Sequence, residues 1–309
     1  MKRLCARYPA LANILTMKPV RLPDNLVWVD GAFPDAGRRA WIAELPATIG
    51  ALAERWGLDV GQPYQPGGQC SWTAPVRDAH GRDLVLKVGW AHVDSASEAD
   101  GLRFWAGDGT VLLHDAHDTG TTQALLLERA VPGTRANCLP EPDQDVVVAG
   151  LLKRLWRPAP AGVFRSLGTM CGEWAAEFAE KLAAGQTHGL DAGLVREGLA
   201  IYDELGRSTR GAVLLCTDLH AENIVAARRE PWLVIDPKPH VGDPHYDPVQ
   251  HMLNCRERLH EDPFGLSDRM ADLLDLDRAR LRLHVFARMV IESIDIPWVR
   301  PVAVRTRPR

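Results

Sequence analysis

The sequence lacks the features that mark membrane, secreted and metal-cluster proteins. No apolar run approaches the length of about 18 residues that a membrane helix requires. The six cysteines stand far apart, so no pair has the spacing of a zinc site or a redox motif. Pro9 and Asn13 interrupt the short apolar stretch at the start, and no small-residue cleavage site follows it. We therefore expect free thiols, no membrane partner and a cytoplasmic location.

An excess of charge of either sign is also absent. The 36 basic and 40 acidic residues give a net charge of −4, and no basic stripe with aromatic residues occurs. Such a chain has no general attraction for nucleic acid. Internal repeats are missing too, and the hydrophobic content of 46% excludes a disordered chain. The length of 309 residues favours about two domains.

The chain is predicted to begin with an irregular, proline-rich arm. The arm covers residues 1–35 and contains a short strand at 26–29. Apolar residues at three- and four-residue spacing then predict a helix over residues 38–56. Because Pro46 falls inside this pattern, we expect a break or kink there.

The next stretch is predicted to be mostly sheet, with one helix. Ser95 or Ser97 is expected to cap that helix, which runs to about Trp105. The predicted strands have alternating apolar residues or stand between turn signals, and they cover residues 71–76, 83–88, 111–114 and 122–128.

The remainder is predicted to be mainly helical. Residues 129–140 have the composition of a linker, and residues 298–309 are basic and irregular. The predicted helices cover residues 143–156, 172–184, 190–205, 248–259, 267–274 and 278–293. A small β-like insert among them has its strands at residues 212–216, 224–226 and 232–235. The fold class is thus α+β, with a sheet lobe over residues 1–128 and a helical lobe over residues 129–309.

The most informative residues for chemistry are Asp218, Asn223 and Asp236. All three fall in turns between short apolar strands, and a strand-turn-strand hairpin can return Asp236 close to Asn223. One carboxylate would then be available to accept a proton, while an amide oxygen and a second carboxylate suit Mg²⁺. Taken alone, Asp218 and Asn223 are better explained as residues that shape a turn.

Lys87 stands inside an apolar strand, and Glu98 follows it in the predicted helix. Taken alone, Lys87 would be expected to face solvent by alternation, and Glu98 to be an exposed helix residue. As a pair, they could direct an ammonium group at nucleotide phosphates.

Two turns complete the set of candidates. Gly67 and Gly68 could place backbone N–H groups near phosphates, although a pair of glycines is more often only a turn. In the later turn, Asp247 could cap a helix and Asp243 could brace the catalytic loop.

Several segments, taken in order, resemble a known family. The stretches C-T-D-L-H-A-E-N, V-I-D-P-K-P and G-D-P-H-Y-D are similar to those of aminoglycoside phosphotransferases, which have a two-lobed protein-kinase-like fold. Within that group, the chain most resembles the streptomycin 6-phosphotransferase and hydroxyurea phosphotransferase family. The stretches W-I-A-E-L-P, E-x-x-G-L-R-x-W and L-L-L-E-R agree in order, and the resemblance covers about residues 25–293.

The resemblance implies a role for each candidate. Asp218 would be the catalytic base, and Asn223 and Asp236 would bind Mg²⁺. Asp243 would support the loop that carries Asp218. The residues implied to hold ATP are Lys87 with Glu98 at the phosphates, Gly67 and Gly68 above them, and the hinge residues Leu126, Glu128 and Arg129 at adenine. One departure is Cys216, which stands where the family usually has histidine and where we expect weaker packing or hydrogen bonding.

The implied activity is phosphorylation of a small alcohol by ATP, with a streptomycin-like aminoglycoside as the acceptor. Such an acceptor is cationic, and acidic side chains could attract it, namely Asp243, Asp247, Glu257 or Glu261. The alternatives are a kinase for another metabolite, such as hydroxyurea, and a nucleotide-binding protein without activity. The sequence leaves the oligomeric state open.

Overall fold

The computed structural model describes residues 20–27, 36–91, 97–186, 188–208 and 210–308. Most of the N-terminal arm and Ser95 lie outside this range, as does the second half of the strand predicted at 26–29. The first half of that prediction is wrong, because residues 24–27 are helical. No helix among the described residues has the length and apolar character needed to cross a membrane. The chain forms two compact units, of which the first contains residues 1–99 and 112–129 and the second contains residues 100–111 and 130–309.

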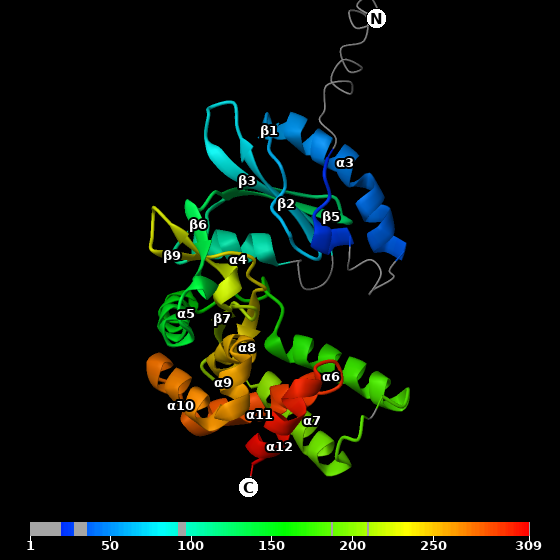
Figure 1. The fold of residues 1–309 in the computed structure, drawn as a ribbon, viewed down its shortest axis with the longest axis vertical. Helices are drawn as coiled ribbons and strands as arrows, with labels where there is room; N and C mark the ends of the chain where they lie inside the picture. The colour runs from blue at the N-terminus through cyan, green and yellow to red at the C-terminus, as the bar shows by residue number, and fades with distance from the viewer. Residues whose placement is uncertain (1–19, 28–35, 92–96, 187, 209, 309) are drawn as a thin grey trace, which may run out of the picture. The chain divides into compact units, whose positions relative to one another are not determined.

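The first unit is built on a five-stranded antiparallel sheet with the strand order β1-β2-β3-β5-β4 (Figure 1). Alternate side chains of the strands point to opposite faces, so β2 alternates between buried and half-buried residues. The strands are β1 (Asp59–Val60), β2 (Ser71–Arg77), β3 (Asp83–Trp90), β4 (Leu113–Asp118) and β5 (Thr122–Glu128). The antiparallel strands predicted at 71–76, 83–88 and 122–128 are therefore confirmed.

Helix α3 (Ala36–Trp56) contributes its apolar side to the core of this unit. Trp41, Leu45 and Ile49 are buried together with Trp72 of the sheet. The predicted break at Pro46 is wrong, because the helix runs unbroken through this residue. Proline removes one helical hydrogen bond, and burial of the large apolar side chains on either side offsets that loss.

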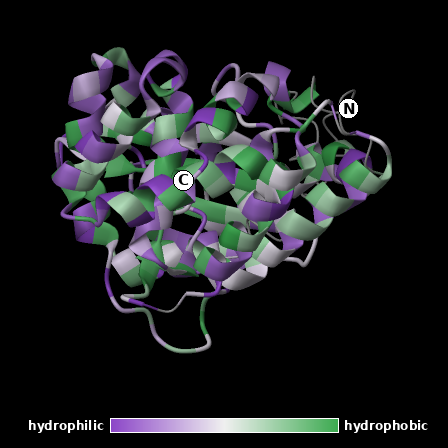
Figure 2. Cartoon of the chain, turned by 90° about the horizontal axis from the view of Figure 1, so that it is seen from below, coloured by the Kyte–Doolittle hydropathy of each residue, from purple (hydrophilic) through white to green (hydrophobic). Residues whose placement is uncertain are grey.

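The second unit is mainly helical. Its main helices are α5 (Glu141–Leu155), α6 (Leu167–Ala183), α7 (Ala192–Gly206), α8 (Asp247–Asn254), α9 (Arg256–Glu261), α10 (Pro263–Leu274), α11 (Arg278–Glu292) and α12 (Arg300–Thr306). Hydrophobic and hydrophilic residues alternate along the helices, as Figure 2 shows. Their apolar faces form one large core.

Oxygen atoms of short side chains cap the starts of several of these helices. Ser166 accepts a hydrogen bond from the backbone of Thr169, and Asp191 and Asp277 do the same for α7 and α11. Each cap satisfies one of the backbone N–H groups that a helix leaves without a partner in its first turn.

Two small sheets lie among the helices. β7 (Val213–Leu215) pairs with β10 (His240–Gly242), and β8 (Ile224–Ala227) lies between β6 (Pro132–Arg135) and β9 (Trp232–Val234). The predicted insert is therefore confirmed. The prediction of a plain linker over 129–140 is wrong, because β6 and a 3₁₀ turn (Ala136–Cys138) form there. β6 is stabilised by pairing with β8, a partner about 90 residues later that local composition does not reveal.

Two further expectations require correction. The predicted helix over 248–259 is divided into α8 and α9 at Cys255, whose backbone leaves the helical conformation. The C-terminal tail is not irregular, because it forms α12, in which Val302 and Ala303 are buried. Burial against the other helices stabilises this short segment despite its basic composition.

Helix α4 (Glu98–Trp105) begins in the first unit, and its remaining residues belong to the second. Its end at Trp105 is as predicted. The indole of Trp105 is buried and donates to the carbonyl of Leu155 over 3.0 Å. Val111 donates to the carbonyl of Val234 over 3.0 Å. These bonds explain why residues 100–111 belong to the helical unit.

The contact between α7 and α11 leaves no room for a side chain at Gly198. A Cβ atom at this position would lie 2.5 Å from Cγ2 of Val290. We predict that Gly198→Ala lowers the free energy of unfolding by about 1–3 kcal/mol, because the two helices must move apart. Chemical denaturation measures this change.

Gly172→Ala in α6 is the matched control, since a Cβ atom there meets nothing within 4 Å. This variant should be more stable than the wild type by about 0.5–1 kcal/mol, because alanine favours the helix. Equal effects of the two substitutions would contradict close packing at Gly198.

Candidate active site

The hairpin of β8 and β9 brings Asn223 and Asp236 together. Ile224 pairs with Val234, and the backbone N–H of Ile235 donates to the carbonyl of Asn223 over 2.9 Å. The two candidate metal ligands therefore stand side by side at the open end of the hairpin. This confirms the prediction that the hairpin returns Asp236 to Asn223.

Asp218 lies in the loop that precedes this hairpin. Nδ2 of Asn223 donates to the backbone carbonyl of Asp218 over 3.0 Å and approaches its Oδ2 at 3.5 Å. Nε2 of His220 lies 3.9 Å from Oδ1 of Asp218. Burial raises the pKa of Asp218, while Lys238 and His220 oppose this rise. A carboxylate with a raised pKa accepts a proton more readily than an ordinary one.

Two residues of this region have left-handed backbone conformations. Thr217, directly before Asp218, has φ = 50°, and Asp236 has φ = 54°. Such angles cost of order 1 kcal/mol or more for residues other than glycine, and they persist only where surrounding bonds impose them. The loop of residues 216–218 and the turn at Asp236 are thus shaped by their neighbours.

Asp247 supplies much of that support. Its Oδ2 accepts hydrogen bonds from the backbone N–H of Cys216 over 3.0 Å and from the indole of Trp156 over 2.9 Å. Its Oδ1 accepts from the backbone N–H of Thr217 over 2.7 Å. The side chain is fully buried, and burial raises its pKa to about 6. The predicted helix cap is wrong, because Asp247 is the first residue of α8 and its carboxylate bonds to the loop that carries Asp218 instead.

Asp243 does not have the role predicted for it. Its carboxylate accepts from the backbone N–H of His245 over 3.0 Å and contacts Nδ1 of His245 at 2.6 Å. It also forms an ion pair with Arg280 and lies 3.5 Å from Nε2 of His284. The hydrogen bonds to these partners hold the pKa of Asp243 well below its usual range. The support that we expected from Asp243 therefore comes from Asp247, four residues later.

Sequence reasoning did not single out Lys238. Its Nζ lies 2.5 Å from Oδ1 of Asp236, and its backbone N–H donates to the carbonyl of Cys216 over 2.9 Å. The carbonyl of Lys238 accepts from Oγ1 of Thr217. The V-I-D-P-K-P motif contained the signal, namely a cation two residues after a candidate metal ligand.

In the first unit, Lys87 and Glu98 form the predicted ion pair. Nζ of Lys87 lies 2.7 Å from Oε1 and 2.6 Å from Oε2 of Glu98. The Lys87 side chain is only 12% exposed, so the expectation from alternation that it faces solvent is wrong. The carboxylate at the start of α4 accounts for this burial, because it provides an opposite charge next to the strand.

The glycine turn has a local partner that the sequence did not suggest. Nδ2 of Asn25 donates to the carbonyl of Gly67 over 3.0 Å, and the buried Arg38 donates to the carbonyls of Leu26 and Gln69 over 2.8 Å. Gly67 has φ = 79°, and a Cβ atom there would lie 2.3 Å from Cβ of Pro23. Residues 23–26 therefore lie against the turn and fix its shape.

The predicted hinge lies largely within the sheet. Leu126 pairs with Leu86, and the backbone N–H of Glu128 donates to the carbonyl of Leu112 over 2.8 Å. The Glu128 carboxylate accepts from the backbone N–H of Leu112 over 3.0 Å. The backbone N–H of Glu128 is thus used inside the unit, and Arg129 is the first residue beyond β5.

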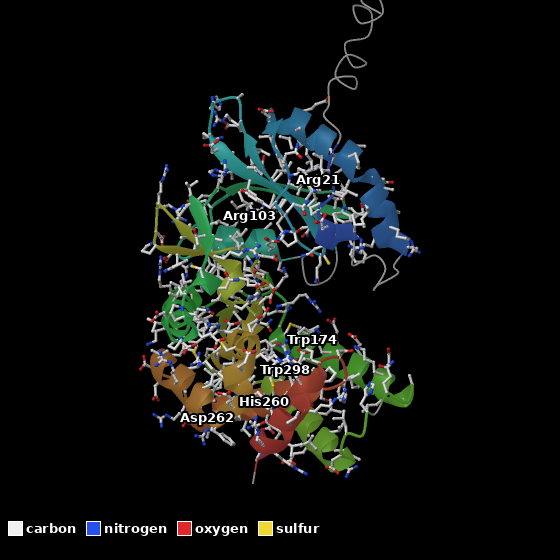
Figure 3. The ribbon with its side chains drawn as sticks, in the orientation of Figure 1. Arg21, Arg103, Trp174, His260, Asp262 and Trp298 are labelled. Carbon is white, nitrogen blue, oxygen red and sulfur yellow. The ribbon has the colours of Figure 1, made fainter. Side chains whose placement is uncertain are left out.

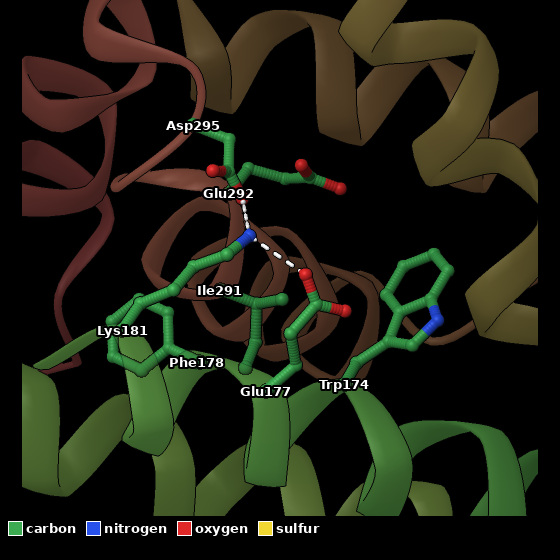
Figure 4. A pocket seen from close by; sticks show the side chains of 7 residues that line it. All are labelled: Trp174, Glu177, Phe178, Lys181, Ile291, Glu292 and Asp295. Carbon is green, nitrogen blue, oxygen red and sulfur yellow. Dashed lines mark hydrogen bonds and ion pairs between the residues drawn. The ribbon is translucent and has the colours of Figure 1, made fainter. Parts of the chain in front are cut away.

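A cavity of about 160 Å³ opens between α6 and α11 (Figure 4). Its lining residues are Trp174, Glu177, Phe178, Lys181, Ile291, Glu292 and Asp295. The ammonium of Lys181 bridges Glu177 at 2.7 Å and Asp295 at 2.6 Å. Three carboxylates stand against the ammonium of Lys181 and the guanidinium of Arg288, which pairs with Glu292, so one negative charge remains in excess around this cavity.

Arg288 lies next to this cavity. Its guanidinium stacks on the ring of Trp174 (labelled in Figure 3) at 4.4 Å, and its Nε donates to Glu292 over 2.7 Å. It also bonds the hydroxyl of Tyr246. The charge of Arg288 is one of the smaller influences that oppose the rise in the pKa of Asp218.

Not all of the acidic residues proposed to attract a cation are available. Asp243 and Asp247 are 1% and 0% exposed and bond to protein groups. Glu257 and Glu261 are exposed on α9. The carboxylates of the cavity, which the sequence did not single out, are better placed for such a role because they line a hollow.

A buried cluster of Asp145, His251 and Cys255 has donor atoms within 4.8 Å of one another. Nε2 of His251 lies 2.9 Å from Oδ1 of Asp145. The same carboxylate accepts from Arg258 over 2.8 Å and from Arg269 over 2.7 Å. Two guanidinium groups already neutralise Asp145, so this cluster joins α5, α8, α9 and α10 rather than forming a site for a further cation.

The antiparallel sheet unit and the helical unit with its Asp218 loop define a protein-kinase-like fold. The chain is similar to a solved aminoglycoside phosphotransferase from Streptomyces rimosus in complex with ADP and streptomycin. The TM-score is 0.51 at 16% identity, with 84% of this chain and 98% of that chain covered. This likeness shows the fold.

The family follows from the sequence. The model of the aminoglycoside/hydroxyurea antibiotic resistance kinase family matches residues 55–296, and the chain belongs to that family. It is 35% identical to a streptomycin 6-kinase from Streptomyces griseus, covering 89% of this chain and 90% of the relative. It is 37% identical to a hydroxyurea phosphotransferase from Kitasatospora aureofaciens, covering 88% and 78%. The chain is thus a phosphotransferase that acts on a small molecule.

The raised pKa of Asp247 predicts a dependence of stability on pH. The folded state keeps this proton up to about pH 6, whereas the unfolded state loses it near the ordinary value of 3.8. The contribution of Asp247 to stability is therefore largest at low pH and decreases as the pH rises from about 4 to 6. The stability of wild type minus that of Asp247→Asn should decrease over this range, as measured by denaturant titration at each pH.

Asp243→Asn is the comparison variant with the opposite sign. The pKa of Asp243 is lowered, so the contribution of this carboxylate to stability is lost as the pH falls. The stability of wild type minus that of Asp243→Asn should therefore not decrease between pH 4 and pH 6. Parallel curves for wild type and Asp247→Asn would contradict the raised pKa.

Proposed function

We propose that this chain is an ATP- and Mg²⁺-dependent O-phosphotransferase whose acceptor is a cationic aminoglycoside of the streptomycin type. The observation that carries the proposal is the grouping of Asp218, Asn223 and Asp236 at the end of the β8–β9 hairpin. Membership of the antibiotic resistance kinase family supports the reaction type.

The residues at the hairpin fit a bound Mg²⁺ ion. Asn223 and Asp236 offer an amide oxygen and a carboxylate, which are the ligands that this ion accepts together with water and phosphate oxygens. In the protein alone, the ammonium of Lys238 lies beside the Asp236 carboxylate, next to the place that a metal ion would take. When bound, Mg²⁺ would neutralise charge on the phosphates of ATP.

Asp218 would act on the acceptor. Its carboxylate would accept a hydrogen bond from the acceptor hydroxyl and orient the oxygen towards the γ-phosphorus of ATP. The bond from this oxygen to phosphorus forms as the bond from phosphorus to the β-phosphate oxygen breaks, and the hydroxyl proton moves to Asp218. The bond from Asn223 to the backbone of Asp218 helps to fix the base.

Lys87 would bind the α- and β-phosphates of ATP. Glu98 holds its ammonium in place with two short contacts, so little side-chain freedom is lost on binding. Gly67 and Gly68 would lie over the phosphates, in a turn whose shape Asn25 and Arg38 fix. The Lys87–Glu98 pair and the turn of Gly67 and Gly68 would together hold the phosphates of ATP.

The negatively charged cavity between α6 and α11 supports a cationic acceptor. Glu177 and Asp295, whose side chains are 63% and 54% exposed, could pair with guanidinium or ammonium groups of an acceptor. Hydroxyurea is small and uncharged and would gain little from these carboxylates. A nucleotide-binding protein without activity has no need for the complete set of Lys87, Asp218, Asn223 and Asp236.

Removing the proposed base should abolish transfer but leave nucleotide binding intact. We predict that Asp218→Asn lowers kcat by about 10³-fold, within the range of general base catalysis. The affinity for ATP should change by less than about threefold, because the base contacts the acceptor rather than the nucleotide. Coupled assay of ADP release and calorimetry of nucleotide binding measure the two quantities.

Asp275→Asn is the control, since it makes the same chemical change at an exposed position at the end of α10. It should leave kcat unchanged. Wild-type turnover in Asp218→Asn would exclude this residue as the base.

The acceptor is tested by incubating the enzyme and ATP·Mg²⁺ with streptomycin, spectinomycin and hydroxyurea. Mass spectrometry should show that streptomycin gains one phosphoryl group. Glu177→Gln, which changes an exposed carboxylate of the cavity, should raise the KM for streptomycin by about tenfold through loss of a charge-assisted contact, while the KM for ATP stays constant.

Glu257→Gln, which changes an exposed carboxylate of α9, should leave both KM values unchanged. Phosphorylation of hydroxyurea alone would show that the acceptor is misassigned. Equal KM values in wild type and Glu177→Gln would exclude the cavity as the place where the acceptor binds.

A further inference from the structure

Lys238 is held between the two segments that carry the proposed base and the proposed metal ligand. Its backbone N–H donates to the carbonyl of Cys216 over 2.9 Å, and its carbonyl accepts from Oγ1 of Thr217 at 2.5 Å. The carbonyl also lies 3.0 Å from Nδ1 of His240. These contacts fix the backbone of Lys238 independently of its side chain.

The side chain of Lys238 contacts the carboxylate of Asp236. Its Nζ lies 2.5 Å from Oδ1 of Asp236, and the side chain is only 20% exposed. The ammonium of Lys238 thus lies next to the carboxylate that the proposed metal ion would bind.

An ammonium and a divalent cation repel each other strongly at such short range. A metal ion bound to the Asp236 carboxylate would lie close to Nζ, which is 2.5 Å from Oδ1, and the repulsion between the two cations favours movement of the ammonium away from this carboxylate. Lysine has a flexible stem of four carbons, which allows this movement without a change in the backbone.

We infer that Lys238 is a positioning residue that occupies the metal side of Asp236 until a divalent cation displaces it. The inference rests on the proposed function, since it takes Asp236 as a metal ligand. Its consequence is that the protein alone binds metal weakly. Metal then enters the site together with the nucleotide, whose phosphates contribute to its binding.

The test uses the full chain and Mn²⁺ alone, without nucleotide, with free Mn²⁺ measured by electron paramagnetic resonance. Lys238→Met should bind Mn²⁺ about fivefold more tightly than the wild type, a modest factor because the pair is partly exposed. Lys238→Arg retains the charge and should bind like the wild type. Lys238→Gln is the second neutral variant, for use if the methionine variant does not fold.

Lys153→Met is the matched control, because Lys153 also pairs with a carboxylate of the second unit, that of Asp275, at an exposed position. This variant makes the same chemical change as Lys238→Met and should leave the affinity for Mn²⁺ unchanged. A similar gain in Lys153→Met would mean that net charge alone sets the affinity, and it would overturn the inference.

Asp236→Asn separates failure of this inference from failure of the proposed function. If Asp236→Asn leaves Mn²⁺ binding unchanged, Asp236 is not a metal ligand and the proposed metal site fails. If Asp236→Asn weakens binding but neutral variants at Lys238 do not strengthen it, only the displacement by metal is wrong. The gain from Lys238→Met should also disappear in the Asp236→Asn background.

Discussion

The loop that carries Asp218 depends on one buried carboxylate, that of Asp247. This side chain accepts hydrogen bonds from two successive backbone N–H groups of the loop and from the indole of Trp156. Burying a carboxylate without partners is very costly, so the folded state has to retain all three donors. The orientation of two peptide groups is thereby set, and the left-handed backbone of Thr217 follows from it. The position of Asp218 is therefore decided 29 residues away, at the start of α8.

This arrangement also explains how a cysteine can stand where the family usually has a histidine. Cys216 is fully buried in the core of the helical unit, and burial and nearby carboxylates raise the pKa of its thiol. Its bond to Asp247 comes from the backbone N–H, which every residue except proline possesses. The loop therefore receives this support whichever side chain the position carries, so long as that side chain fits the core.

Much of the fold could be predicted because its signals are local. Alternating apolar residues predicted β2 and β3. The strand-turn-strand pattern after Asn223 predicted the hairpin that brings Asp236 back to Asn223. Local patterns could not show that β6 pairs with β8, or that burial stabilises α12. Asp247 was misjudged because an acidic residue before a helical pattern is typical of a cap, and its true partners lie 30 and 31 residues earlier. Lys238 could not be recognised from the sequence, because its contacts join the loop of Cys216 and Thr217 to the turn at Asp236, and local patterns do not show that these segments meet.

The left-handed backbone at Asp236 restricts which amino acids this position can accept. Glycine and asparagine adopt φ near 54° at low cost, whereas alanine and branched residues do so only with strain. Most substitutions would combine loss of the carboxylate with a distorted turn. Asp236→Asn removes the negative charge but keeps the size of the side chain and the left-handed backbone. A loss of activity in this variant would therefore report on the chemistry of the site rather than on its folding.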